Sequence, residues 1–327
     1  MPFSEKFIED AGREIKVSSI ATDFEIAKKY IHKALERAAM ASDAFDISDV
    51  DIYMRGSYKN GTNIYFPNKL EIMVELKRTH EYDPEQEFVP GDSKIVDNYF
   101  VADLGLNFSP ENFTDELYQG LAEQVGEHVE YTGKTMILNP IGKLKHAVEI
   151  YSGFSFNFVE IDEEGLPKTK DIAHGVVIHN GRINFQTVTF PRIHSRNIQA
   201  KDIATNGFYR RCVRFFKSID VIYDREFGTY DPTEEFQSGA SGYFIECLLY
   251  NVPNKIFTTN RGGFAEIVYK VLNYLNNCNL DDFVCTNEVW TLFNGLDGFW
   301  NTRGAKVFLK RVTHLYNIFP ASREFLA

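Results

Sequence analysis

The stretch GSYKNGTNI, residues 56–64, lies between two segments predicted as strands, VDIYM at 50–54 and LEIMVEL at 70–76. A Gly-Ser pair at a turn from a strand into a helix directs backbone N–H groups and a hydroxyl towards a phosphate. The pair alone is too common to identify a function. Together with both strands, it predicts a phosphate-binding turn built from Gly56 and Ser57, in which Ser57 contacts the phosphate.

The segments around this stretch predict an α/β first part and a mostly helical second part. Apolar residues at helical spacing indicate a long helix over 22–41. The pattern then predicts a helix at 110–127 and strands at 134–139, 146–158, 174–179 and 182–190. Helical spacing returns at 207–224, 240–251, 263–277, 286–293 and 303–318. A polar stretch near 200–206 separates the two parts, so we expect domains at 1–205 and 206–327.

Composition favours a folded protein with a small ligand. The 327 residues are 44% hydrophobic and include 28 Phe and 17 Tyr, which excludes the composition typical of disorder. The net charge is −11. Proteins that grip long nucleic acids usually have a basic surface, so any basic site here must be local.

The cysteines and the apolar segments indicate a cytoplasmic protein. Cys212, Cys247, Cys278 and Cys285 form no CxxC pair, which argues against a disulfide framework and against zinc. Free thiols fit a reducing compartment. No run of about 18 apolar residues predicts a membrane span, and the first residues do not resemble a signal peptide.

Several motifs resemble the CD-NTase family, the bacterial cyclic-oligonucleotide synthases related to cyclic GMP-AMP synthase. The stretch at 56–64 is similar to the nucleotidyltransferase signature of this family. The segment YFIECLLYNVP at 243–253 is the most specific match, because eleven consecutive positions agree. Other matches are YTGKTMIL at 131–138, VRFFK at 213–217, and the spaced residues Pro191, His194, Asn197, Lys201 and Thr205.

The resemblance extends from about residue 22 to residue 318. It implies an α+β fold: a polymerase-beta-like nucleotidyltransferase core, with a mixed sheet flanked by helices, and a C-terminal helical lobe. The long helix at 22–41 would belong to the core.

The resemblance also implies a metal-binding carboxylate triad, and this sequence departs from it. In the family, three aspartates hold two magnesium ions that activate a 3′-hydroxyl and neutralise a triphosphate. The corresponding positions here are Lys69, Glu71 and Glu149. We therefore expect Glu71 and Glu149 to be the catalytic carboxylates and the ligands of Mg²⁺ or Mn²⁺. Lys69 offers an ammonium, which we expect to bind the triphosphate as a point charge.

A second acidic string precedes the Gly-Ser pair. Asp49 and Asp51, in SDVDI at 48–52, reproduce the catalytic spelling. In the resembled fold the catalytic pair follows the Gly-Ser turn on the next strand. We therefore interpret Asp49 and Asp51 as the solvated start of the incoming strand.

The helical part contributes two further nucleotide-binding candidates by resemblance. Lys217 matches a phosphate-contacting lysine, and Tyr243 matches a tyrosine that stacks on a nucleobase. The alternatives are a solvated charged stripe for Lys217, with Arg210 and Arg214 on the same predicted helix face, and a core aromatic for Tyr243.

The activity implied is attack of a 3′-hydroxyl on an α-phosphate of a nucleoside or deoxynucleoside triphosphate, which yields a cyclic or linear oligonucleotide signal for antiphage defence. The implied partner is a co-encoded effector that the product activates or inhibits, and the Hailong-type branch is one candidate. The alternative, which Lys69 favours, is a catalytically degenerate sensor or partner subunit that binds nucleotides or oligonucleotides. A transfer-RNA-modifying toxin is a weaker third hypothesis, because the net charge argues against it.

Overall fold

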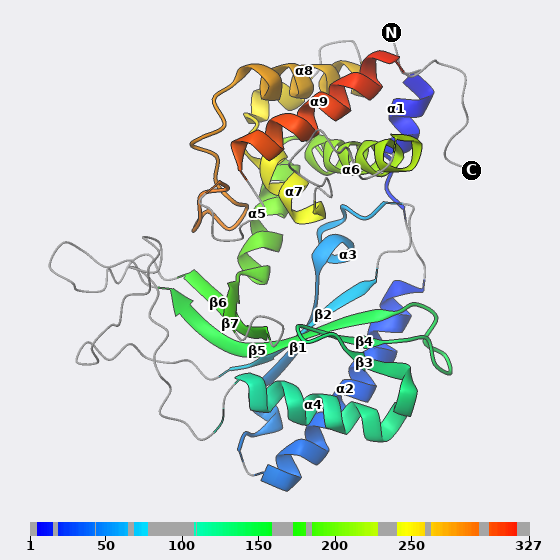
Figure 1. Cartoon of the computed structure of the whole chain (residues 1–327), viewed down its shortest axis with the longest axis vertical. Helices are drawn as coiled ribbons and strands as arrows, with labels where there is room; N and C mark the ends of the chain where they lie inside the picture. The colour runs from blue at the N-terminus through cyan, green and yellow to red at the C-terminus, as the bar shows by residue number, and fades with distance from the viewer. Residues whose placement is uncertain are drawn as a thin grey trace, which may run out of the picture. The chain divides into compact units, whose positions relative to one another are not determined.

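The computed structural model describes residues 5–15, 19–42, 44–64, 69–77, 108, 110–158, 173–180, 185–227, 241–258, 263–293 and 301–318 (Figure 1). Contacts between residues divide the chain into two units. The sheet unit comprises Lys16–Lys59 and Lys69–Ile193, and the helical unit comprises Met1–Ile15, Asn60–Asn68 and His194–Ala327. These units are defined by contacts, so the division into domains at residues 205 and 206 stays a prediction.

The sheet unit contains a mixed sheet. Its strand order is β1-β2-β5-β4-β3, and β6 pairs with both β5 and β7. The pairing of β2 with β5 is parallel, and the other pairings are antiparallel. The strands are β1 (Val50–Arg55), β2 (Leu70–Leu76), β3 (Val129–Tyr131), β4 (Met136–Leu138), β5 (Val148–Phe158), β6 (Ala173–Asn180) and β7 (Phe185–Thr189).

Two helices cover one face of this sheet, α2 (Ile20–Ser42) and α4 (Pro110–Val125), as Figure 1 shows. Alternate residues of a strand point to opposite faces. In β2 the buried Leu70, Ile72, Val74 and Leu76 belong to the core shared with these helices. Glu71, Met73 and Glu75 therefore lie on the opposite face, which we call the open face.

The helical unit has its own hydrophobic core. The fully buried Phe215, Phe216 and Leu248 lie near its centre. Its helices are α1 (Glu5–Ala11), α6 (Phe208–Phe227), α7 (Gly242–Tyr250), α8 (Gly263–Asn277) and α9 (Thr302–Ile318), and α5 (Pro191–Ala204) enters it at His194. Cys212 and Cys247 are free and buried in this core, as small apolar residues would be.

The predicted fold class is confirmed, and one predicted helix is wrong. Residues 286–293 form turns instead of a helix. The Asn287 side chain accepts hydrogen bonds from the backbone N–H groups of Val289 and Trp290, and Glu288 has a φ of 60°. Such side-chain bonds compete with helical ones. Among the described helices, none has the length and apolar character needed to cross a bilayer.

Candidate active site

The Gly-Ser turn lies at the end of β1, where the short helix α3 (Gly56–Asn60) begins directly after Arg55. Gly56 has a φ of +69°, a region that side chains disfavour. A Cβ atom at this position would also overlap the Glu71 carboxylate. The turn therefore requires glycine, and the Glu71 carboxylate lies against the backbone beside Ser57.

The two predicted catalytic carboxylates lie side by side. Glu71 on β2 is the register partner of Glu149 on the parallel strand β5. Arg55 is the register partner of Glu71 on the antiparallel strand β1. Arg55, Glu71 and Glu149 therefore form one row across three strands, at the edge of the open face where the Gly-Ser turn begins. Lys69 is exposed and lies immediately before β2.

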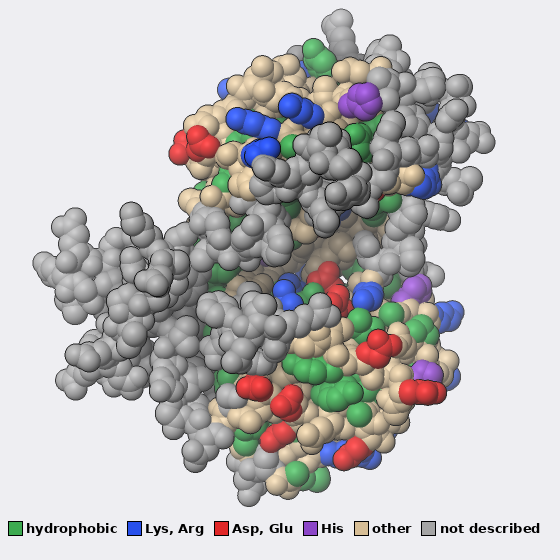
Figure 2. All heavy atoms as spheres, viewed as in Figure 1, with side chains coloured by type: hydrophobic (Ala, Val, Ile, Leu, Met, Phe, Trp, Pro, Cys, Tyr) green, Lys and Arg blue, Asp and Glu red, His purple; other side chains and the backbone are tan. Residues whose placement is uncertain are grey.

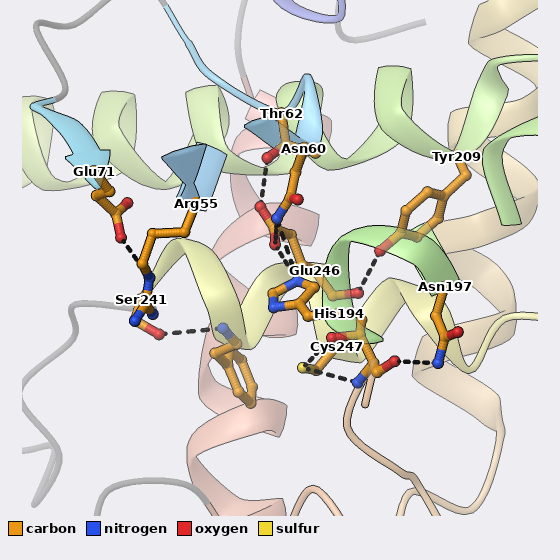
Figure 3. A network of polar contacts seen from close by, with 12 residues as sticks. Arg55, Asn60, Thr62, Glu71, His194, Asn197, Tyr209, Ser241, Glu246 and Cys247 are labelled. Carbon is orange, nitrogen blue, oxygen red and sulfur yellow. Dashed lines mark hydrogen bonds and ion pairs between the residues drawn. The ribbon is translucent and has the colours of Figure 1, made fainter. Parts of the chain in front are cut away.

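Arg55 is a residue of this site that the sequence analysis missed. Its Nε lies 3.5 Å from Oε2 of Glu71, and the two side chains are 19% and 25% exposed (Figure 3). Its guanidinium carbon lies 4.2 Å from the centre of the Tyr151 ring. Within the described residues, the buried Nε and Nη1 have no hydrogen-bond acceptor. The guanidinium thus compensates the charge of Glu71 while retaining donor capacity.

Glu149 is held by its neighbours on the open face. The Thr135 hydroxyl donates a hydrogen bond of 2.9 Å to Oε1 of Glu149. Burial raises the pKa of the Tyr151 phenol well above its usual range, and the Glu71 and Glu149 carboxylates add to this shift, while Arg55 opposes it. Tyr151 is therefore a neutral phenol at neutral pH.

The donor set fits one magnesium ion and does not fit two. Among the described residues, no group of three or more His, Cys, Asp and Glu side chains is placed to hold a metal. Glu71 and Glu149 are two carboxylates on adjacent strands. Mg²⁺ commonly takes one or two protein carboxylates and completes its octahedron with water and phosphate oxygens. A second ion would need a further carboxylate, and the remaining position of the pattern holds Lys69, while Glu71 is already paired with Arg55.

A second polar cluster lies further along the open face. Glu75 accepts hydrogen bonds of 2.7 Å from both Tyr53 and Ser155. Arg192 pairs with Asp51 at 2.7 Å and with Glu75 at 3.3 Å. Asp51 lies opposite Glu75 and four residues before Arg55, which is about 13 Å along a strand. Asp51, from the acidic string at 48–52, is thus part of an ion-pair network away from the Gly-Ser turn.

Lys217 lies in the helical unit and is buried there. Its Nζ lies 2.7 Å from Oε1 of Glu246 and 3.2 Å from the Thr62 hydroxyl. Only 7% of Lys217 and 3% of Glu246 are exposed. The ammonium that was predicted to contact a phosphate therefore has an internal counterion in this structure, and its role towards nucleotide stays a prediction.

The Glu246 carboxylate is surrounded by donors (Figure 3). Besides Lys217, it accepts hydrogen bonds from Asn60 at 3.2 Å and from Thr62, and His194 Nε2 lies 2.8 Å from Oε2. Burial alone would raise the pKa of Glu246, but Lys217 and His194 outweigh it and hold the pKa below its usual range. Glu246 is therefore charged and saturated. The sequence motif at 243–253 predicted the helix that carries Glu246 but not the side chains that donate to its carboxylate.

The remaining helical candidates also have internal partners. Arg214 donates to the backbone oxygens of Gly12 and Gly61, and Arg210 pairs with Asp202 at 3.3 Å. The Tyr243 ring centre lies 4.7 Å from that of His194, and Tyr243 packs against the helical core. Its stacking on a nucleobase stays a prediction.

Acidic and basic side chains are mixed on the described surface. In Figure 2, Lys, Arg, Asp, Glu and His side chains lie among hydrophobic ones, and neither sign of charge covers the described part of this face. The described part of this face therefore presents no extended basic surface of the kind that binds long nucleic acids.

Comparison with known proteins identifies the helical part. Residues 196–317 match the model of the cGAS/DncV-like nucleotidyltransferase C-terminal helical domain. The chain is 24% identical over 291 residues to the cyclic UMP-AMP synthase of Rhodothermus marinus, covering 88% of this chain and 91% of the relative. It is 24% identical over 299 residues to the cyclic nucleotide synthase CdnE01 of Staphylococcus haemolyticus, covering 89% and 93%.

Solved structures show the same fold. The Rhodothermus marinus CdnE c-UMP-AMP synthase with Apcpp and Upnpp has a TM-score of 0.71 at 21% identity, covering 99% of both chains. The Elizabethkingia meningoseptica CdnE cyclic dinucleotide synthase with GTP and Apcpp has a TM-score of 0.68 at 20% identity, covering 95% of this chain and 98% of the other. The chain is thus similar to cyclic-nucleotide synthases over most of its length and shares the fold of the two solved synthases.

Proposed function

We propose that the chain binds nucleoside or deoxynucleoside triphosphates at the row of Arg55, Glu71 and Glu149 and joins them into a cyclic or linear oligonucleotide. The single observation that supports this most strongly is the register of Glu71 beside Glu149 at the Gly-Ser turn. Two carboxylates on adjacent parallel strands next to a phosphate-binding turn are suited to phosphoryl transfer. Similarity to synthases that bind nucleotide analogues supports the substrate class.

The residues of the row have separate tasks in this proposal. Gly56 and Ser57 bind the triphosphate through the turn, and Lys69 contributes a cation beside it. Glu71 and Glu149 would hold one Mg²⁺ or Mn²⁺ ion, which supplies charge neutralisation for the triphosphate. Thr135 orients Glu149. The 3′-hydroxyl of one nucleotide attacks the α-phosphate of another, the bond to the β-phosphate breaks, and pyrophosphate leaves.

Incubation with nucleotides tests the activity. The full chain is mixed with each nucleoside and deoxynucleoside triphosphate, singly and in pairs, with Mg²⁺ or Mn²⁺, and pyrophosphate release and products are measured. We expect release in the wild-type protein and a loss of at least about 100-fold in Glu71→Gln and in Glu149→Gln. Asp51→Asn, in the second cluster, is the matched control and should retain release.

A second candidate function is a nucleotide- or oligonucleotide-binding subunit without turnover. The exposed Lys69 favours it, because it puts a cation where the synthases' pattern has a carboxylate. The ion pair between Arg55 and Glu71 adds a second cation to the same site. Binding of a triphosphate without pyrophosphate release under any condition would support this function over the first.

We further propose a cytoplasmic role in antiphage defence, in which a co-encoded effector responds to the oligonucleotide product. Similarity to structures of STING-associated CdnE synthases supports a signalling role of this kind. The Hailong-type branch stays one candidate. Assay of the genetic neighbour's activity with and without the purified product is the direct test.

A further inference from the structure

We propose that Arg55 is a built-in counterion that lets the open face bind a polyphosphate without a divalent metal. The inference rests on the proposed nucleotide-binding function and assigns a residue and a property to that site. Arg55 is the half-buried cation beside Glu71, at the residue immediately before the Gly-Ser turn.

The charges around the turn explain why a counterion is needed. The Glu71 carboxylate lies against Gly56, and Glu149 lies beside it on the next strand. A triphosphate bound at the turn would meet two negative charges at short range, and half-buried charges are screened less than exposed ones. Binding of a triphosphate therefore requires a cation close to these two carboxylates. Arg55, with Nε 3.5 Å from Oε2 of Glu71, already supplies one.

The guanidinium has unused capacity for a ligand. Its Nη1 is buried and makes no hydrogen bond within the described residues, and its Nε, which faces Glu71 at ion-pair distance, makes none either. Stacking on Tyr151 at 4.2 Å fixes the plane of the guanidinium. A planar, oriented guanidinium binds phosphate oxygens with two parallel donors, which an ammonium does not do. Arg55 is thus suited to a phosphate oxygen that approaches from the turn.

Lys69 adds a second positive charge to the same edge. It lies two residues before Glu71, directly before the first residue of β2, and is exposed. Two cations and two carboxylates make the site neutral in the described structure. Three aspartates at positions 69, 71 and 149 would give the same site a net charge of −2 with Arg55 retained.

Calorimetric titration of the full chain with inorganic tripolyphosphate tests the proposal, because this ligand has no base or sugar to bind elsewhere. Titrations run at constant ionic strength in EDTA and in Mg²⁺, and ATP, GTP, CTP and UTP are then titrated in the same two buffers. We expect the Kd in EDTA to lie within about threefold of the Kd in Mg²⁺. Arg55→Gln should weaken binding in EDTA by about 10- to 100-fold, and Arg55→Lys should recover part of the loss.

The matched control is Arg192→Gln, which removes an ion-paired arginine from the second cluster of the same face and should change the Kd less than twofold. Binding that requires Mg²⁺ in the wild-type protein would overturn the inference and leave the proposed function standing. Unchanged binding by a folded Arg55→Gln would overturn it too. Absence of binding for all five ligands in both buffers would instead overturn the proposed function. The wild-type comparison needs no variant, so it decides the question even where Arg55→Gln fails to fold.

Discussion

Two carboxylates in this molecule differ in how completely their neighbours neutralise and hydrogen-bond them. Glu246 in the helical unit is 3% exposed, and Lys217, His194, Asn60 and Thr62 donate to it or pair with it. Glu71 in the sheet unit has a side chain that is 25% exposed, and its partner Arg55 keeps two nitrogens without acceptors. The first site is saturated and structural, whereas the second has capacity for an anion.

The largest expected loss in the free energy of unfolding follows from a substitution of Glu246. Glu246→Gln keeps the shape of the side chain but leaves the Lys217 ammonium buried without a counterion. Removal of one partner of a buried pair typically lowers the free energy of unfolding by about 3–5 kcal/mol. Glu71→Gln should lower it by less than about 1 kcal/mol, as is typical of accessible pairs. Urea denaturation of both variants measures the contrast, and similar losses would contradict the distinction between the sites.

Asp220 is a third carboxyl, which is buried and on which the nearby cation Arg311 has a smaller effect than burial. Burial raises its pKa to about 7, Asp224 raises it further, and Arg311 opposes the shift. The folded state therefore keeps this proton at pH values where the unfolded chain has lost it, so stability falls as the pH rises from about 4 to 7. At pH 8 we expect Asp220→Asn to be more stable than the wild type by up to about 4 kcal/mol.

Thermal unfolding at pH 5 and pH 8 checks this expectation. The gain from Asp220→Asn should shrink at pH 5, where the wild-type carboxyl is protonated. A gain that does not depend on pH would show that packing, and not the charge of Asp220, causes it.

The smallest effect is expected from the donor to Glu149. Thr135→Val removes the hydroxyl that donates at 2.9 Å to Oε1 and keeps the shape of the side chain. We expect the free energy of unfolding to fall by about 1 kcal/mol, because water reaches the half-buried carboxylate and replaces the donor. A loss as large as that of Glu246→Gln, measured in the same urea titration, would show that the open face is also a saturated site.

The sequence contained enough information for most of the fold. The strand at 70–76 was predicted with the bounds of β2, and the helix at 263–277 with those of α8, because apolar residues at regular spacing dominate both. The prediction of a helix at 286–293 was wrong because the Asn287 side chain accepts hydrogen bonds from the backbone of the residues that follow it. The spacing of apolar residues does not detect this local preference. The short helix α3 was not predicted as a helix, because its five residues were interpreted as a turn.

The resemblance placed Glu71 by its spacing from the Gly-Ser pair and Glu149 on a later strand, and the catalytic roles of both stay predictions. Glu71 and Glu149 were both named, and their register brings them together. Arg55 was missed because its importance comes from strand pairing: it lies opposite Glu71 only after β1 and β2 align. The partner of Lys217 was missed for the same kind of reason, since Glu246 comes from another helix.

The steric exclusion at Gly56 has a consequence for the search for related genes. A side chain there would overlap the Glu71 carboxylate, and the positive φ disfavours one in any case, so glycine is required at this position. A profile that demands three aspartates discards this chain. One that demands the glycine and accepts glutamate at positions 71 and 149 and lysine at position 69 retains it.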